Sequence, residues 1–175
     1  EKGEVDAAYV ERRYLDQFDN MPGVTITDGL PSLETQNTVL FNFNTEPKDN
    51  AWLGSGRLGD GVPPDFFSDA DVRKGFAMIF DYDSFIRDAY RSKAVQARGP
   101  IPAVLFAHNT RQRPWPYSPH QAEAAFKRAR SGEVWAKGFS LSVAYTEGRN
   151  DRRTACRLLK LGAEKLNPLF HVDCR

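Results

Sequence analysis

The spacing of apolar and polar residues divides the chain into alternating segments and helical segments. Alternation predicts strands at residues 24–27, 37–44 and 139–145, and again at 170–174, near the end of the sequence. A short apolar run at residues 5–10 predicts one more strand. Helical spacing predicts helices at residues 11–19, 69–80, 82–90, 119–130 and 151–166.

Capping residues mark the starts of four of these helices. Ser68, followed by carboxylates in the first turn, is typical of a helix start, and Asp81 begins a second such pattern. Ser118 precedes a proline and, three residues on, a glutamine, which is a strong start signal. Asn150 is the expected cap of the long last helix.

The last three elements predict a parallel strand pair. The helix at 151–166 has one apolar face, made by Ala155, Leu158, Leu159, Gly162, Ala163 and Leu166. A strand, a helix and a second strand in this order form a βαβ crossover, which makes the two strands parallel. The sequence therefore predicts an α/β fold with a partly parallel sheet.

Composition then excludes several classes of protein. The 175 residues are 41% hydrophobic and carry a net charge of only +1, which argues against a disordered chain and against a nucleic-acid partner. No apolar run approaches the ~20 residues of a membrane helix. The sequence starts at Glu1 without a visible signal peptide, which suggests a processed chain or a piece of a longer one.

No catalytic, metal or cofactor motif stands out. Residues 54–59 spell G-x-G-x-x-G, but the following Asp-Gly-Val-Pro-Pro forbids the helix that a dinucleotide fingerprint needs. The three histidines, His108, His120 and His171, lack metal-ligand spacing. We therefore expect no enzyme activity, no metal and no cofactor. The long loop at residues 47–65 is a surface excursion or a binding loop that uses Trp52 or Arg57.

Two groups of cationic residues leave alternatives open. Arg111, Arg113, Trp115 and Tyr117 could stack on bases or sugars, or could form a solvated loop with a packed tryptophan. Arg149, Arg152, Arg153 and Arg157 form either a solvated helix face or an anion site at a helix start.

The two cysteines also leave alternatives open. Cys156 lies at the edge of the apolar face of the last helix, and Cys174 shares a strand face with Phe170 and Val172. These faces could meet, so a disulfide would form in an oxidising compartment, while two buried free thiols are the default.

The order of the segments resembles the extracellular solute-binding proteins of family 5, the periplasmic peptide- and nickel-binding components of ABC importers. The resemblance is carried by motifs at residues 3–10, 39–45, 71–81, 99–102 and 117–124, and it extends through residue 174. Departures are Gly75 in place of alanine, Tyr82 in place of arginine, and a longer loop at 47–69.

This resemblance implies a mixed sheet flanked by helices, as in one lobe of a periplasmic-binding-protein-like (type II) fold. Residues 1–175 would be a single domain cut from a longer two-lobe protein. It would be periplasmic or at the cell surface, bind a peptide or small-molecule solute by lobe closure, and work with a second lobe and a permease. A ligand-sensing domain of a transcriptional regulator is the alternative, and an enzyme with an unrecognised site a less favoured one.

The candidate binding residues lie in the turn before the last helix. Ligands of open α/β sheets sit at the carboxyl ends of the strands, and in the resembled peptide binders this turn borders the cleft. Arg149 could pair with a solute carboxylate; an ordinary capped turn is the alternative. The candidate residues are Tyr145, Thr146, Glu147, Arg149, Asn150 and Asp151.

Overall fold

The computed structural model describes residues 4–10, 12–31 and 38–175, and its contacts divide the chain into two units, 1–32 and 33–175. The described part of the first unit contains one 3-10 helix, η1 (Arg12–Gln17), where a longer helix was predicted. The predicted strands at 5–10 and 24–27 are wrong, because these residues form no strand. Neither a short apolar run nor alternation is sufficient for a strand, whose backbone groups need a neighbouring strand to pair with.

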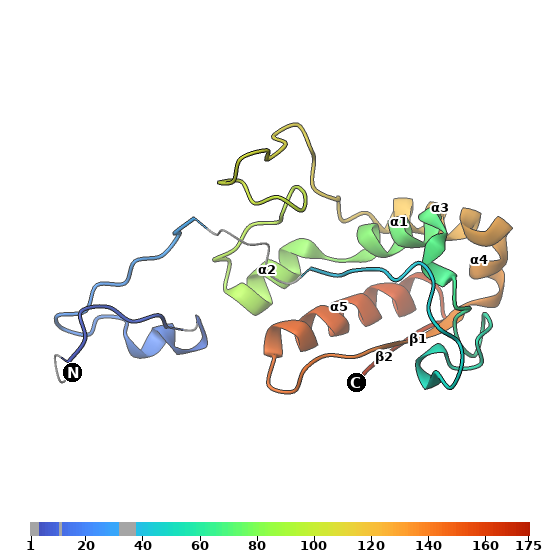
Figure 1. The fold of residues 1–175 in the computed structure, drawn as a ribbon, viewed down its shortest axis with the longest axis horizontal. Coiled ribbons are helices and arrows are strands. Elements are labelled where there is room, and N and C mark those ends of the chain that lie inside the picture. Colours follow the sequence, from blue (N-terminus) through green and yellow to red (C-terminus); the bar gives the residue numbers. More distant parts are fainter. Residues whose placement is uncertain (1–3, 11, 32–37) are drawn as a thin grey trace. The chain divides into compact units, whose positions relative to one another are not determined.

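The second unit contains the helices and strands that position the candidate site (Figure 1). Its α-helices are α1 (Ala70–Ile79), α2 (Tyr82–Tyr90), α3 (Pro119–Arg128), α4 (Glu133–Lys137) and α5 (Asn150–Leu166). Its strands are β1 (Phe139–Val143) and β2 (Phe170–Cys174). Its 3-10 helices are η2 (Ala51–Leu53), η3 (Phe66–Ser68) and η4 (Ala129–Gly132).

The βαβ prediction is confirmed. β1 and β2 pair in parallel, from Phe139 opposite Phe170 to Val143 opposite Cys174, and α5 connects them. Phe139, Phe170 and Val172 are buried on the face that meets the helices. Two parallel strands form the only sheet that the structure describes in residues 38–175.

The core of the second unit is a cluster of phenylalanine rings between the helices and the sheet. Phe139 and Phe170 stack across the two strands with ring centroids 4.4 Å apart. Phe126 of α3 meets Phe170 and Phe76 edge-on, at 5.0 and 5.4 Å. These contacts hold α1 and α3 against the sheet. The absence of a side chain at Gly75 permits the close approach of the two helices, since an added Cβ would lie 2.6 Å from the Phe126 ring.

The helix starts follow the predicted caps with two corrections. Asp81 accepts from the Ser84 N–H at 2.9 Å and Ser118 from the Gln121 N–H at 3.4 Å, as predicted. The cap of α1 is Asp69 instead of Ser68, because the Ser68 hydroxyl donates to the Asp65 carbonyl in η3. The cap position of α5 is Arg149, and Asn150 is the first helical residue.

The predicted strand at residues 37–44 is also wrong over its described part, 38–44; Asn37 lies outside the described residues. Its apolar side chains contact helices instead of a neighbouring strand. Phe41 packs on Phe67 with ring centroids 4.9 Å apart, and the Arg73 guanidinium lies 4.3 Å from the centre of the Phe43 ring. Alternation here therefore reflects packing along a helix surface.

The glycine-rich loop at residues 47–65 folds back on itself beside β1. Gly54 and Gly61 form an isolated antiparallel bridge, and the Gly59 N–H donates to the Gly138 carbonyl at 3.0 Å. An added Cβ at Gly61 would clash with the Leu53 carbonyl, so this glycine is required by the close approach. Trp52 remains half exposed, and its role in binding stays a prediction.

The turn between β1 and α5 as a candidate binding site

The candidate site begins where both parallel strands end. The Arg175 N–H donates to the Val143 carbonyl at 2.9 Å, and the Tyr145 N–H donates to the Arg175 carbonyl at 2.8 Å. The chain leaving β1 is thus held by the end of the β2 segment for two residues beyond the last strand pair. The turn that follows, residues 146–149, starts from a fixed position at the carboxyl edge of the sheet.

The turn itself is a tight reversal that requires glycine. The Arg149 N–H donates to the Thr146 carbonyl at 3.2 Å, which closes a four-residue turn. Gly148, at the third position, has φ of +80°, the value that a type II turn demands there. The sequence thus encodes a sharp change of direction directly into the first turn of α5.

An arginine–aspartate ion pair lies at the end of the turn. The Arg149 guanidinium donates to both carboxylate oxygens of Asp151, at 3.0 and 2.7 Å. The hydrogen bond from Arg149 lowers the pKa of Asp151 below its ordinary value of 3.8, outweighing the partial burial that would raise it. Tyr90, 61 residues earlier in the chain, reaches the same carboxylate with its hydroxyl at 3.5 Å.

Two further polar side chains of the turn hold neighbouring arginines. The Thr146 hydroxyl accepts from Arg152 at 3.3 Å, and the Asn150 side-chain carbonyl accepts from Arg153 at 2.6 Å. Arg157, one helical turn further on, makes no hydrogen bond or ion pair within residues 38–175. The start of α5 is therefore a cationic surface whose first three arginines are already oriented by the turn.

The structure brings most of the predicted site residues together. Arg149 is joined to Asp151 through its side chain and to Thr146 through its backbone, the Asn150 side chain bonds to Arg153, and Glu147 is exposed at the tip of the turn. Tyr145 is half buried and packs against the core. Sequence reasoning did not assign Tyr90 or the backbone of Arg175 to the site, and their sequence separation from the turn gave no signal. Whether these residues contact a solute stays a prediction.

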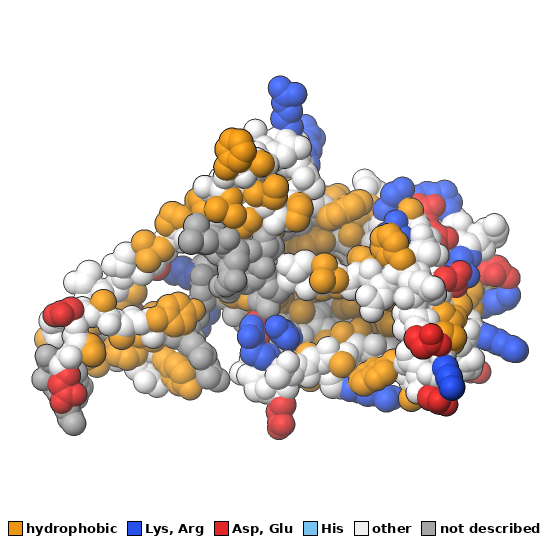
Figure 2. All heavy atoms as spheres, in the orientation of Figure 1, with side chains coloured by type: hydrophobic (Ala, Val, Ile, Leu, Met, Phe, Trp, Pro, Cys, Tyr) orange, Lys and Arg blue, Asp and Glu red, His pale blue; other side chains and the backbone are white. Residues whose placement is uncertain are grey.

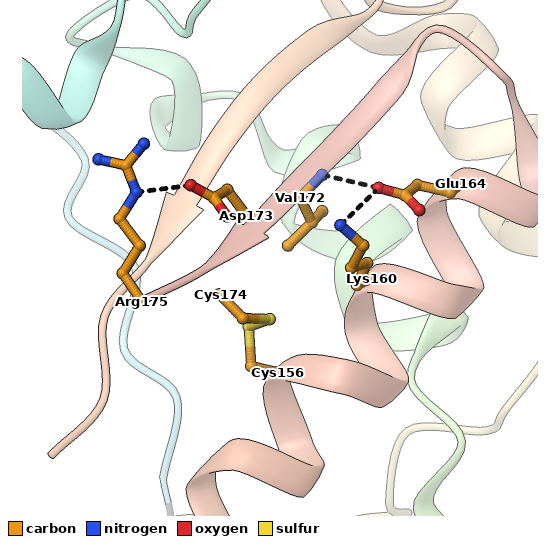
Figure 3. Close-up of a disulfide and its surroundings, with 7 residues drawn as sticks. All are labelled: Cys156, Lys160, Glu164, Val172, Asp173, Cys174 and Arg175. Atoms are coloured by element: carbon orange, nitrogen blue, oxygen red, sulfur yellow. Dashed lines mark hydrogen bonds and ion pairs between the residues drawn. A yellow bond between two sulfur atoms is a disulfide. The ribbon is translucent and has the colours of Figure 1, made fainter. Parts of the chain in front are cut away.

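Cys156 and Cys174 are joined in a disulfide, so they are not two buried free thiols (Figure 3). Their Cα atoms are 6.0 Å apart, and Cys156 is almost fully buried. The bond ties the second turn of α5 to the last residue of β2. Both the entry and the exit of the site turn are thereby attached to the same strand end.

Charged residues line the strand β2 next to this disulfide. Glu164 of α5 accepts from the Val172 N–H at 3.4 Å and pairs with Lys160 at 3.3 Å, while Arg175 pairs with Asp173 at 2.5 Å (Figure 3). The Glu164 carboxylate thus satisfies a backbone donor on the side of β2 that faces α5.

The described residues contain no group of three or more His, Cys, Asp or Glu side chains arranged to hold a metal ion. None of the helices within the described ranges is long and apolar enough to cross a membrane.

Comparison with known proteins identifies relatives of this chain. It is 32% identical over 89 residues to di/tripeptide-binding protein 2 of Pseudomonas aeruginosa (strain UCBPP-PA14), a match that covers 51% of the chain and 17% of that protein. The chain thus spans less than a fifth of this relative's length.

Two solved structures share the fold. The ABC transporter-associated periplasmic binding protein DppA from Helicobacter pylori, solved with the peptide STSA, matches with a TM-score of 0.54 and 19% identity over 63% of this chain and 20% of that one. The oligopeptide binding protein from Thermus thermophilus, complexed with a pentapeptide, matches with a TM-score of 0.50 and 14% identity over 62% of this chain and 20% of that one. They confirm the predicted α/β class, with helices flanking a small sheet.

The family assignment rests on nearly the whole sequence. Residues 1–169 match the model described as bacterial extracellular solute-binding proteins, family 5 Middle. The chain therefore belongs to the bacterial extracellular solute-binding proteins of family 5.

Proposed function

We propose that this chain forms a solute-binding lobe of an extracytoplasmic receptor that serves an ABC importer for peptides or similar small solutes. The family assignment supports this proposal, and so do the names of the relatives, which are peptide-binding proteins. The chain spans only 17–20% of their lengths, which supports a longer parent protein with a second lobe. The name of one of them, an ABC transporter-associated periplasmic binding protein, supports a permease partner.

The observation that carries the proposal is the two-point pair between Arg149 and Asp151 at the edge of the sheet. The two hydrogen bonds, at 3.0 and 2.7 Å, have the fork geometry in which arginine binds any carboxylate, including the terminus of a peptide. The Arg149 side chain is 50% exposed and that of Asp151 16%, so a solute approaches the arginine side of the pair.

Binding would then exchange one carboxylate for another. A peptide carboxylate would take the place of Asp151 on Arg149, while Asp151 would keep its hydrogen bond from the backbone of Arg152. Closure of a second lobe would exclude water and strengthen these charge-assisted hydrogen bonds. No bond is made or broken in this cycle, so no catalytic group is needed.

The experiment is a calorimetric titration of the complete receptor chain with di- and tripeptides, comparing Arg149→Ala with Arg157→Ala. Arg157 is a matched control because it is exposed on the same helix and makes no hydrogen bond or ion pair within residues 38–175. We expect Arg149→Ala to weaken peptide affinity about tenfold or more, the value of a charge-assisted hydrogen bond, and Arg157→Ala to leave it unchanged.

Peptides with an amidated carboxyl terminus extend the test. These amidated peptides should bind the wild type more weakly than the free peptides do, and Arg149→Ala should not weaken their binding further. Unchanged affinity of Arg149→Ala for free peptides would overturn the assignment of the turn. A thermal-shift screen against peptides, sugars and nickel chelates checks the solute class, since a ligand of the folded form raises the melting temperature.

A further inference from the structure

A hollow separate from the turn between β1 and α5 lies between the start of α2 and the proline-rich segment before α3. Its volume is about 390 Å³. We call it the proline–aromatic hollow; it is lined by Tyr82, Asp83, Gln96, Arg113, Trp115 and Tyr117, with Pro114 and Pro116. It contains the cation and the two aromatic rings of residues 113–117, which the peptide-receptor function leaves unexplained.

The walls of the hollow are held by contacts within the chain. The Gln96 side chain donates to the Trp115 carbonyl at 2.8 Å, and the Ser118 N–H donates to the Met78 carbonyl at 2.8 Å. Pro114 and Pro116, on either side of Trp115, fix their own φ angles. The segment is therefore organised before any ligand arrives, which lowers the entropy cost of binding.

Tyr82 forms a fixed aromatic wall. Its hydroxyl donates to the Ala77 carbonyl at 2.8 Å, and its ring meets Phe80 edge-on at 5.1 Å. Burial raises the pKa of Tyr82 to about 12, so the side chain stays neutral and keeps this hydrogen bond at physiological pH. The ring therefore presents a stationary apolar surface to the hollow.

The other two rings remain available to a ligand. Trp115 and Tyr117 are each 49% exposed although they line a hollow. Figure 2 shows hydrophobic side chains gathered on the connection between α2 and α3 to which these residues belong. Half-exposed aromatic rings beside a concave surface are suited to stacking on a flat apolar group.

Charges of both signs bound the same hollow. The carboxylate of Asp83 and the guanidinium of Arg113 are exposed, and neither forms an ion pair within the described residues of this unit. An anion alone would meet Asp83 and a cation alone would meet Arg113. A ligand that carries both an ammonium and a carboxylate group satisfies both side chains.

We propose that the proline–aromatic hollow binds a free α-amino acid with an aromatic side chain. The aromatic group stacks on Trp115 and Tyr117, the ammonium group pairs with Asp83, and the carboxylate pairs with Arg113. This site is separate from the turn between β1 and α5, and it goes beyond the peptide-receptor function. Its ligand is a single amino acid, and its residues come from α2 and the 113–117 segment.

The first experiment is calorimetric titration of the 175-residue chain with L-tryptophan and L-phenylalanine. Trp115→Ala is compared with Trp52→Ala, a matched control because Trp52 is 50% exposed and lies outside the hollow. We expect Trp115→Ala to weaken binding at least tenfold, Trp115→Phe to retain most of it, and Trp52→Ala to change nothing. Absence of binding to the wild type at millimolar ligand, or equal losses for both alanine variants, overturns the proposal.

Blocked ligands test the two charges. N-acetyl-phenylalanine should bind the wild type at least fivefold more weakly than phenylalanine and show no further loss on Asp83→Asn. Phenylalanine amide should likewise bind the wild type at least fivefold more weakly than phenylalanine and show no further loss on Arg113→Gln. The control is Arg111→Gln, an exposed arginine two residues before Arg113. Losses that are independent of the matching side chain refute the assigned orientation.

A competition experiment separates this site from the proposed peptide site. A saturating dipeptide should leave the affinity for phenylalanine unchanged. Displacement of phenylalanine by the dipeptide would merge the two sites and overturn the proposal, whereas failure of phenylalanine to bind would leave the Arg149 experiment unaffected.

Discussion

Opening the Cys156–Cys174 disulfide should remove a large part of the stability of this chain. The bond closes a loop with a sequence separation of 18 residues. The loss of chain entropy in the unfolded state gives about 3 kcal/mol for a loop of this length. Because small proteins are stable by only about 5–15 kcal/mol, reduction should lower the free energy of unfolding by a fifth or more.

The measurement is urea unfolding of the oxidised and the reduced chain, followed by far-ultraviolet circular dichroism. With a denaturant slope of about 1–3 kcal/mol/M, the unfolding midpoint should fall by roughly 1–3 M on reduction. The control is the double variant Cys156→Ala/Cys174→Ala, whose midpoint should lie near that of the reduced wild type and ignore reductant. Thiol titration before unfolding confirms the redox state of each sample.

Hydrogen exchange gives the local form of the same prediction. The bond ties α5 to the strand end that holds the Tyr145 amide, so that amide should lose protection on reduction before the core amides of α3 do. A midpoint that reduction leaves in place, or a double variant as stable as the oxidised chain, would refute the reasoning.

Three further predictions concern a glycine, a cap and a carboxylate. Gly75→Ala should lower the free energy of unfolding in urea by about 1 kcal/mol, although alanine favours helices, because its Cβ would meet the Phe126 ring. Adding Phe126→Leu should relieve the crowding. A Gly75→Ala variant more stable than the wild type would contradict this. Asp69→Ala should lower the free energy of unfolding by about 2 kcal/mol, because Asp69 accepts hydrogen bonds from the Asp71, Val72 and Arg130 amides. The control Ser68→Ala should change it by no more than about 0.5 kcal/mol. Equal losses for the two variants would show that Ser68 also caps the helix. The pKa of Asp151 is lowered from 3.8, so the stability that this carboxylate contributes is complete above pH 3.8 and is lost as the pH falls below it. When the free energy of unfolding is measured as a function of pH, Asp151→Asn should reduce its decrease at acid pH. An unchanged decrease would show that the Arg149–Asp151 pair does not cause it.

The helices α1, α2, α3 and α5 were predictable because their signals are local, whereas the short α4 was not predicted and a 3-10 helix stands in place of the helix predicted at 11–19. Asp81 and Ser118 cap α2 and α3 through bonds to residues three positions away, and Pro119 adds its own start signal. The cap of α1 shifted from Ser68 to Asp69 because η3 occupies the Ser68 hydroxyl, which the residue types alone do not show.

Strands were predictable only where the chain supplies a partner. β1 and β2 satisfy each other through the α5 crossover, and their apolar residues meet the phenylalanine core. Residues 38–44 have an equally clear alternation, yet Phe41 and Phe43 contact Phe67 and Arg73 instead of a neighbouring strand. Alternating apolar and polar residues indicate that the two sides of an extended segment have different surroundings. A helix surface on one side and solvent on the other give the same alternation as a position in a sheet.

The place of the candidate site was predictable, and its internal contacts were not. The βαβ pattern locates the turn at the carboxyl edge of the sheet. The Tyr90 hydroxyl, the Arg175 backbone and the disulfide reach the turn from elsewhere in the chain, and only the folded arrangement brings them within contact. Sequence reasoning therefore left the state of the cysteines open.

These through-space contacts determine which part of the site can adjust to a solute. The strand side of the turn is held by two backbone hydrogen bonds to Arg175, and the helix side by the Cys156–Cys174 bond. The backbone of the turn is thus attached at both ends, whereas the Arg149 side chain is half exposed and its hydrogen bonds to Asp151 can be exchanged for others. Under the proposed function, solute binding would therefore change side-chain pairing in this lobe and leave its backbone in place, so that the large motion of closure falls to the connection between lobes.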